Sequence, residues 1–192
     1  MFFKRDNPHA LEIGMVGAKM GDRFLQVGCA HGARMAAIAS KVGLSGRAVV
    51  VAPDEASAAR ARKGAANEGV LVDIEVTWPT RLPFDDGSFD VAVVDDTAGL
   101  VGTMRAEDRV QTLREVHRVL RPGGRVMIIG VAPRGGFGAI LSRAQSGPPF
   151  AASGDATRSL EAEGFRSARI LAEREGLAFV EAIKAGAVTS RR

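Results

Sequence analysis

Short apolar runs alternate along this chain with longer amphipathic stretches. Residues 48–52 form a continuous, largely β-branched run, which is typical of a parallel strand buried on both faces. Residues 33–42 instead carry apolar side chains at helical spacing. Read in this way, the sequence predicts strands at 24–27, 48–52, 72–77, 89–94, 125–130, 168–173 and 178–184. The predicted helices are 33–42, 53–67, 107–120 and 156–163.

The order of these elements indicates the fold. Strands that alternate with helices predict βαβ units and a mostly parallel sheet. The last two strands are joined by a short turn at Glu175-Gly176, so one strand near the C-terminus is expected to be antiparallel. We therefore predict a Rossmann-like α/β fold, a three-layer α/β/α sandwich. At 192 residues, the chain is expected to form a single domain, residues 1–192.

A glycine-rich turn, Gly28-Cys29-Ala30-His31-Gly32, follows the first predicted strand. Ligands of such sheets bind at the carboxyl ends of the strands. Glycine permits a sharp turn, and its missing side chain lets backbone N–H groups approach a ligand closely. The turn is therefore where we expect a nucleotide-like cofactor. The alternative is an ordinary connection between a strand and a helix.

Composition and charge exclude several classes of protein. The net charge is +4, from 26 basic and 22 acidic side chains, which is too balanced to favour nucleic-acid binding. The N-terminal region lacks an apolar stretch long enough for a signal peptide or a membrane span. We therefore expect no nucleic acid, no membrane span and a cytoplasmic location. Cys29 is the single cysteine, so no intramolecular disulfide is expected, and we interpret it as a small packed residue rather than a nucleophile.

Three segments carry a family resemblance, in the order 24–32, 82–90 and 113–124. They read Phe-Leu-Gln-Val-Gly-Cys-Ala-His-Gly, Leu-Pro-Phe-Asp-Asp-Gly-Ser-Phe-Asp and Leu-Arg-Glu-Val-His-Arg-Val-Leu-Arg-Pro-Gly-Gly. Together they resemble the class I S-adenosylmethionine (SAM) methyltransferases, in particular the small-molecule group that includes quinone-biosynthesis enzymes. The resemblance implies SAM as the cofactor, held near the glycine-rich turn, and a small molecule as the methyl acceptor.

The chain departs from the family at the positions that hold SAM. The resemblance implies three acids there, and the matching positions carry Gln26, Ala52 and Trp78. Glutamine accepts a hydrogen bond without charge, and alanine accepts none. Two neighbours offer compensation. Asp54 either turns toward the ribose or caps the following helix, and Trp78 either stacks on the adenine or plugs its pocket.

Other residues near the turn are weaker candidates. Ala30 replaces a family glycine, at a cost of about 1 kcal/mol if that position has a positive φ. His31 is either a general base or a surface side chain. Asp95 and Asp96, after strand 89–94, are the acidic candidates, but two adjacent acids do not make a metal cage, so no metal is expected. The predicted cofactor-binding residues are Gln26, Gly28, Cys29, Ala30, His31, Gly32, Ala52, Pro53, Asp54, Trp78, Pro79 and Asp95, and no catalytic residue is assigned.

Two functions remain open from the sequence. One is a SAM-dependent methyltransferase with a remodelled pocket, because methyl transfer mainly requires alignment of donor and acceptor. The other is a non-catalytic, methyltransferase-like binding or partner subunit, associated with another protein or with a second copy.

The missing acids affect the expected affinity for SAM. A hydrogen bond to a charged acceptor contributes about 1.5–3 kcal/mol. Losing two or three of them weakens binding by roughly 10²- to 10⁵-fold.

Overall fold

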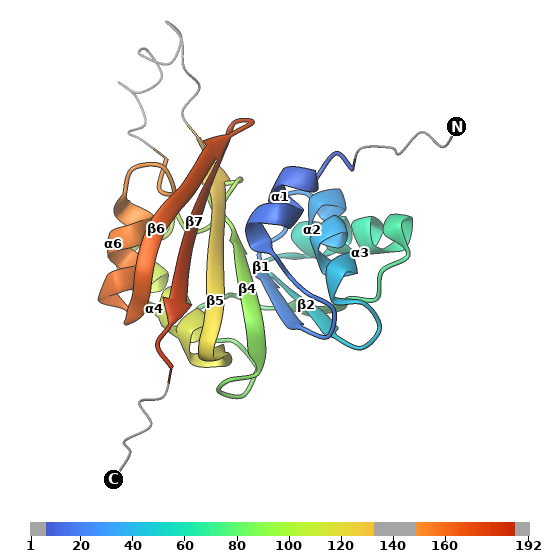
Figure 1. The fold of residues 1–192 in the computed structure, drawn as a ribbon, viewed down its shortest axis with the longest axis horizontal. Helices are drawn as coiled ribbons and strands as arrows, with labels where there is room; N and C mark the ends of the chain where they lie inside the picture. The colour runs from blue at the N-terminus through green and yellow to red at the C-terminus, as the bar shows by residue number, and fades with distance from the viewer. Residues whose placement is uncertain (1–6, 133–148, 187–192) are drawn as a thin grey trace, which may run out of the picture.

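The structure is a computed structural model that describes residues 7–132 and 149–186. These residues form one seven-stranded sheet in the order β3-β2-β1-β4-β5-β7-β6, with helices on both faces (Figure 1). Strand β7 is antiparallel to both β5 and β6, whereas the other pairs are parallel. The predicted α/β/α sandwich, with its mostly parallel sheet and antiparallel strand near the C-terminus, is confirmed.

The strands are β1 (Arg23–Val27), β2 (Arg47–Ala52), β3 (Asp73–Val76), β4 (Phe89–Asp95), β5 (Leu120–Val131), β6 (Phe165–Arg174) and β7 (Leu177–Lys184). The helices are α1 (Ala10–Val16), α2 (Gly32–Ala39), α3 (Glu55–Glu68), α4 (Ala106–Val119) and α6 (Asp155–Ala162), and a 3₁₀ turn, η1 (Ser40–Val42), follows α2.

Each face of the sheet has its own apolar core. Successive strand residues point to opposite faces, so Leu25 packs in the core that α4 and α6 cover, and Phe24 packs in the core beneath α1, α2 and α3. Strands β1, β2 and β4 are buried on both faces, which for β2 confirms the prediction from its continuous apolar run.

Two features differ from the sequence prediction, and a third predicted feature is largely untested. Helix α1 was not predicted, because its seven residues are too few to show a clear helical period. Strand β5 begins at Leu120, directly after α4, and the predicted terminator Arg121-Pro122-Gly123-Gly124 lies inside it at an irregularity in its pairing with β4. The predicted loop at 146–150 falls mainly outside the described residues.

The topology places a ligand site beside β1. This strand lies between β2 and β4, where the order of the strands reverses. The crevice at the carboxyl end of such a switch point is where open α/β sheets bind ligands. Gly28 leaves β1 with a φ of 79°, a left-handed conformation that glycine adopts without strain.

Candidate cofactor site

A cavity of about 160 Å³ lies at the switch point, beside the glycine-rich turn. It brings together six of the predicted residues, namely Gly28, Cys29, Ala30, Pro53, Asp54 and Asp95. Four other lining residues were not predicted, namely Ser57, Arg60, Ala98 and Leu100. Ser57 and Arg60 lie within the predicted second helix, but no pattern in the sequence indicates that they face the turn.

The backbone N–H groups of the turn are engaged within the protein. The Gly28 N–H donates to the Val51 carbonyl at 2.8 Å, and the Cys29 N–H donates to Ser57 Oγ at 3.1 Å. The Ala30 N–H donates to Asp95 Oδ2 at 2.9 Å. Neighbouring elements therefore already supply acceptors for these three N–H groups.

Gln26 in β1 and two residues of the turn, Gly32 and Ala30, are explained by contacts and backbone geometry within the protein. The buried Gln26 donates from Nε2 to the Gly28 carbonyl at 3.0 Å and so braces the turn. A Cβ on Gly32 would lie 2.0 Å from the Arg60 carbonyl oxygen, so this glycine lets α2 approach α3. Ala30 is not among the described residues with positive φ, so the strain anticipated for an alanine does not arise.

Asp95, the last residue of β4, accepts four hydrogen bonds from within the protein. Its carboxylate accepts hydrogen bonds from Arg34 at 2.8 Å, from Ala30 N–H at 2.9 Å, and from the Thr97 hydroxyl and N–H at 2.6 and 3.2 Å. Burial raises the pKa of Asp95, but the Arg34 cation and these hydrogen bonds outweigh it and hold the pKa below its usual value. Asp95 therefore stays ionised and anchors the turn to β4.

Asp96 positions the segment that follows β4. It accepts hydrogen bonds from the Val101 and Gly102 N–H groups at 2.7 and 2.9 Å. Burial raises its pKa above the usual value, although those two N–H groups lower it. From α4, Arg109 donates to the carbonyls of Val101, Gly102 and Met104. Residues 97–104 are therefore held from both sides.

Asp54 is an N-cap, one of the two alternatives left open by the sequence. It precedes α3 and accepts a hydrogen bond from the Ser57 N–H through Oδ1 at 2.6 Å, so it is an N-cap. It is also exposed and lines the cavity. No hydrogen bond within the described residues uses its second oxygen, Oδ2. Nearby, Arg60 Nε donates to the Cys29 carbonyl at 2.9 Å.

The remaining predicted residues do not line this cavity. Ala52 is buried at the end of β2, where its carbonyl accepts from the Thr77 N–H at 3.0 Å, and Pro79 is also buried. Trp78 is 48% exposed. His31 is exposed and makes no capping hydrogen bond to α2.

Cys29 lies in the core beneath α2. Burial, assisted by the Asp95 charge, raises the pKa of its thiol to about 11, although Arg60 and Arg34 oppose the shift. The thiol is therefore protonated near neutral pH, which fits a packed residue rather than a nucleophile.

Two of the three signature segments bind each other. Glu115 on α4 accepts a hydrogen bond from the Leu82 N–H at 2.8 Å. Arg118 donates to the Phe84 and Leu82 carbonyls at 2.7 and 3.0 Å, and it pairs with both Glu115 and Asp86. Arg118 holds the pKa of Glu115 below its usual value. These residues fasten the loop between β3 and β4 to α4.

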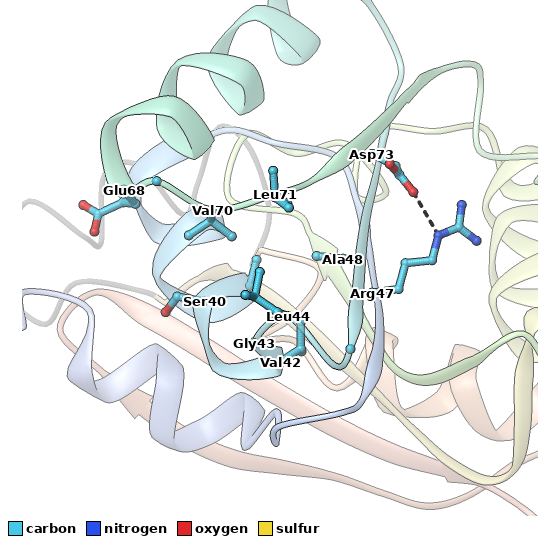
Figure 2. Close-up of a pocket in the computed structure, with 13 residues that line it drawn as sticks. Ser40, Val42, Gly43, Leu44, Arg47, Ala48, Glu68, Val70, Leu71 and Asp73 are labelled. Atoms are coloured by element: carbon cyan, nitrogen blue, oxygen red, sulfur yellow. Dashed lines mark hydrogen bonds and ion pairs between the residues drawn. The ribbon is translucent and has the colours of Figure 1, made fainter.

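A larger cavity, of about 360 Å³, lies at the opposite end of the sheet (Figure 2). It is bounded by the amino end of β2, the end of α3 and η1, and Leu44 and Leu71 on its rim are highly exposed. Arg47 and Asp73 form an ion pair across β2 and β3, with Nε and Oδ2 2.9 Å apart. Because this cavity is away from the carboxyl ends of the strands, it is not the expected cofactor site.

Comparison with known proteins identifies the family. Residues 25–128, more than half of the chain, match the family described as "Methyltransferase domain". The chain belongs to this family. The match agrees with the resemblance of the three signature segments, which implies S-adenosylmethionine as the cofactor.

Individual relatives agree with this assignment. The chain is 29% identical, over 123 residues, to the ubiquinone/menaquinone biosynthesis C-methyltransferase UbiE of Hydrogenovibrio crunogenus, covering 63% of this chain and 46% of that protein. It is 33% identical to the 27-O-demethylrifamycin SV methyltransferase of Amycolatopsis mediterranei, covering 60% and 40% of the two chains. It thus spans less than half the length of these relatives.

A solved structure, the SAM-dependent methyltransferase of Aquifex aeolicus, shares the fold of this methyltransferase domain. Its TM-score is 0.71 at 19% identity, with 92% of this chain and 89% of that chain covered. In the part of the chain that the structure describes, no helix has the length and apolar character needed to cross a membrane. Within residues 7–132 and 149–186, no three His, Cys, Asp or Glu side chains are grouped as metal ligands.

The two ends of the cavity differ in how they fit SAM. At the β2 end, Asp54 Oδ2 is a carboxylate oxygen suited to accept from a ribose hydroxyl. Arg60 lines the same cavity and is a cation suited to a carboxylate. At the β4 end, Asp95 is buried, and its carboxylate already accepts three hydrogen bonds at Oδ1 and one at Oδ2 within the protein, so it is less available to an ammonium group than Asp54 Oδ2. The donor set therefore fits the adenosine part of SAM better than the amino group of its methionine part.

Proposed function

We propose that this domain is a SAM-dependent methyltransferase that modifies a small molecule. The observation that carries the proposal is the cavity at the switch point, formed by the glycine-rich turn, Asp54 and Asp95, in a chain that belongs to the methyltransferase domain family. The small-molecule acceptor is inferred from the relatives, whose names refer to ubiquinone, menaquinone and a rifamycin.

The chain's contribution to methyl transfer is binding and orientation. SAM, when bound, supplies an already activated methyl group, so the protein mainly has to align it with the acceptor. In this proposal, Asp54 holds the ribose and Trp78 offers its exposed indole for stacking on the adenine. An indole that filled the adenine pocket would be buried, whereas Trp78 is 48% exposed. The proposal assigns no general base.

The proposed location is the cytoplasm, in keeping with the single cysteine. The second candidate is a non-catalytic binding subunit, which acts with a protein partner or as a homodimer. It is favoured by one observation: Asp95 and three N–H groups of the turn are all engaged within the protein.

Ligand-dependent thermal unfolding separates the two candidates. S-adenosylhomocysteine (SAH) at 100 times its dissociation constant adds about 2.7 kcal/mol to the free energy of unfolding. That corresponds to roughly 5–10 °C in Tm for a domain of this size. The proposal predicts such a shift with SAM and SAH and none with the unrelated nucleotide GTP. No shift with either SAM or SAH would favour the non-catalytic candidate.

A further inference from the structure

Leu100 occupies the crevice at the switch point. It belongs to the segment after β4, yet its Cδ2 atom lies only 2.6 Å from where a Cβ on Gly28 would be. The carbonyl oxygen of Asp95 lies 3.1 Å from the same point, so Leu100 packs where β1 and β4 diverge. Ligands of this architecture bind in that crevice.

The position of Leu100 is fixed by buried polar contacts. Asp96 binds the N–H groups of Val101 and Gly102, the two residues that follow it. Arg109 binds the carbonyls of the same two residues. On the other side, Arg34 bridges Asp95 and Thr97 with two hydrogen bonds of 2.8 Å. The backbone that carries Leu100 is therefore anchored before and after it.

The size of the cavity is consistent with a side chain that fills part of it. Its volume is about 160 Å³, whereas small-molecule pockets commonly span about 300–1,000 Å³. The polar groups free to meet a ligand, Asp54 Oδ2 and the guanidinium of Arg60, come from the β2 side. The β4 side presents Leu100 and Ala98 together with the buried Asp95, whose carboxylate binds Arg34 and the Ala30 N–H.

We propose that Leu100 is a specificity-determining residue, which admits the adenosine part of a ligand and restricts the methionine part. This inference rests on the proposed function, because it assumes an adenosyl ligand in this cavity. Its consequence is that the amino-acid tail of SAM or SAH adds little affinity while Leu100 is present. Replacing Leu100 by a smaller residue makes room for the tail.

Isothermal titration calorimetry with two ligands tests this inference. SAH carries the tail, whereas 5′-methylthioadenosine has the same nucleoside and sulfur without it. In the wild type we expect the two dissociation constants to agree within about threefold. In Leu100→Ala we expect SAH to bind about 10-fold more tightly and 5′-methylthioadenosine to change less than about twofold, which corresponds to about 1.4 kcal/mol gained by the tail alone.

A control variant and a fallback variant complete this test. Leu44→Ala removes an exposed leucine at the opposite end of the sheet and should leave the affinity ratio unchanged. If Leu100→Ala does not fold, Leu100→Val should move the ratio in the same direction by a smaller factor. A ratio that changes less than threefold in Leu100→Ala, or less than 1.5-fold in the fallback variant, would overturn this inference alone. Binding of neither ligand to any of these proteins would overturn the proposed function as well.

Discussion

Polar side chains have different roles in two regions: the loop between β3 and β4, which α4 binds, and the cavity at the glycine-rich turn. Around the loop, Glu115 and Arg118 have the residue types that the family pattern leads one to expect, and they bind backbone groups of residues 82–84. Around the cavity, the expected acids are absent, and the buried acid that lines it, Asp95, binds Arg34, Thr97 and the Ala30 N–H within the protein. The comparison teaches that two of the three signatures report on the scaffold, whereas the ligand site combines the glycine-rich turn with residues outside the signatures, such as Asp54 and Leu100.

The largest expected effect concerns a residue that the sequence places in the site and the structure places in the scaffold. Gly32→Ala puts a Cβ 2.0 Å from the Arg60 carbonyl oxygen, a backbone atom that no rotamer change can move. We expect a loss of about 3 kcal/mol of unfolding free energy, at the upper end for overpacking. Urea unfolding measures it. Gly14→Ala in α1 has no neighbour within 4 Å and is the control.

That pair of variants also tests the division between scaffold and site. If Gly32→Ala were as stable as Gly14→Ala but bound SAH poorly, Gly32 would belong to the ligand site after all.

Glu115→Ala should have the next largest effect on stability. It leaves the buried Leu82 N–H without its acceptor and removes one partner of Arg118. An unsatisfied buried donor costs about 1–3 kcal/mol, and we expect about 2 kcal/mol in urea unfolding. Asp86→Ala removes the exposed partner of the same arginine and should cost less than about 0.5 kcal/mol. Equal losses in the two variants would contradict the assignment of Glu115 to the scaffold.

The pH dependence of this contact gives a smaller and more specific signal. Because the folded pKa of Glu115 lies below its ordinary value, its stabilising effect is present above the unfolded pKa of about 4.3 and is lost as the pH falls through the folded pKa. Glu115→Gln removes this titration. The difference in Tm between wild type and Glu115→Gln should therefore be largest near pH 7 and shrink below about pH 4. A difference independent of pH would show that Glu115 does not contribute through its charge.

The fold was largely predictable because its information is local. A continuous apolar run predicts a buried strand such as β2. A proline followed by acids predicts the start of a helix, here α3. Helix α1 escaped because seven residues are too few to show a period. The entry into β5 at Leu120 depends on pairing with Phe89, which is distant in sequence.

The site was predictable only in part, because its decisive contacts join distant residues. Position along the chain was enough to place Asp54, Asp95 and Gly28 at one end of the sheet. The state of Asp95 depends on Arg34, 61 residues away in the sequence. Leu100 reaches Gly28 only because Asp96 and Arg109 fix the backbone on either side of it. No residue type or spacing signals such contacts.

The most direct test of the central claim, that SAM binds at the glycine-rich turn, is the affinity of Asp54→Ser for SAH by isothermal titration calorimetry. Serine also caps helices, so the hydrogen bond to the Ser57 N–H can be retained while the second carboxylate oxygen is lost. We predict a roughly 10-fold weaker Kd, since a hydrogen bond to a charged acceptor contributes about 1.5–3 kcal/mol. Asp73→Ser, beside the cavity at the other end of the sheet, should bind like the wild type. Equal affinity in Asp54→Ser and wild type would contradict the proposed site.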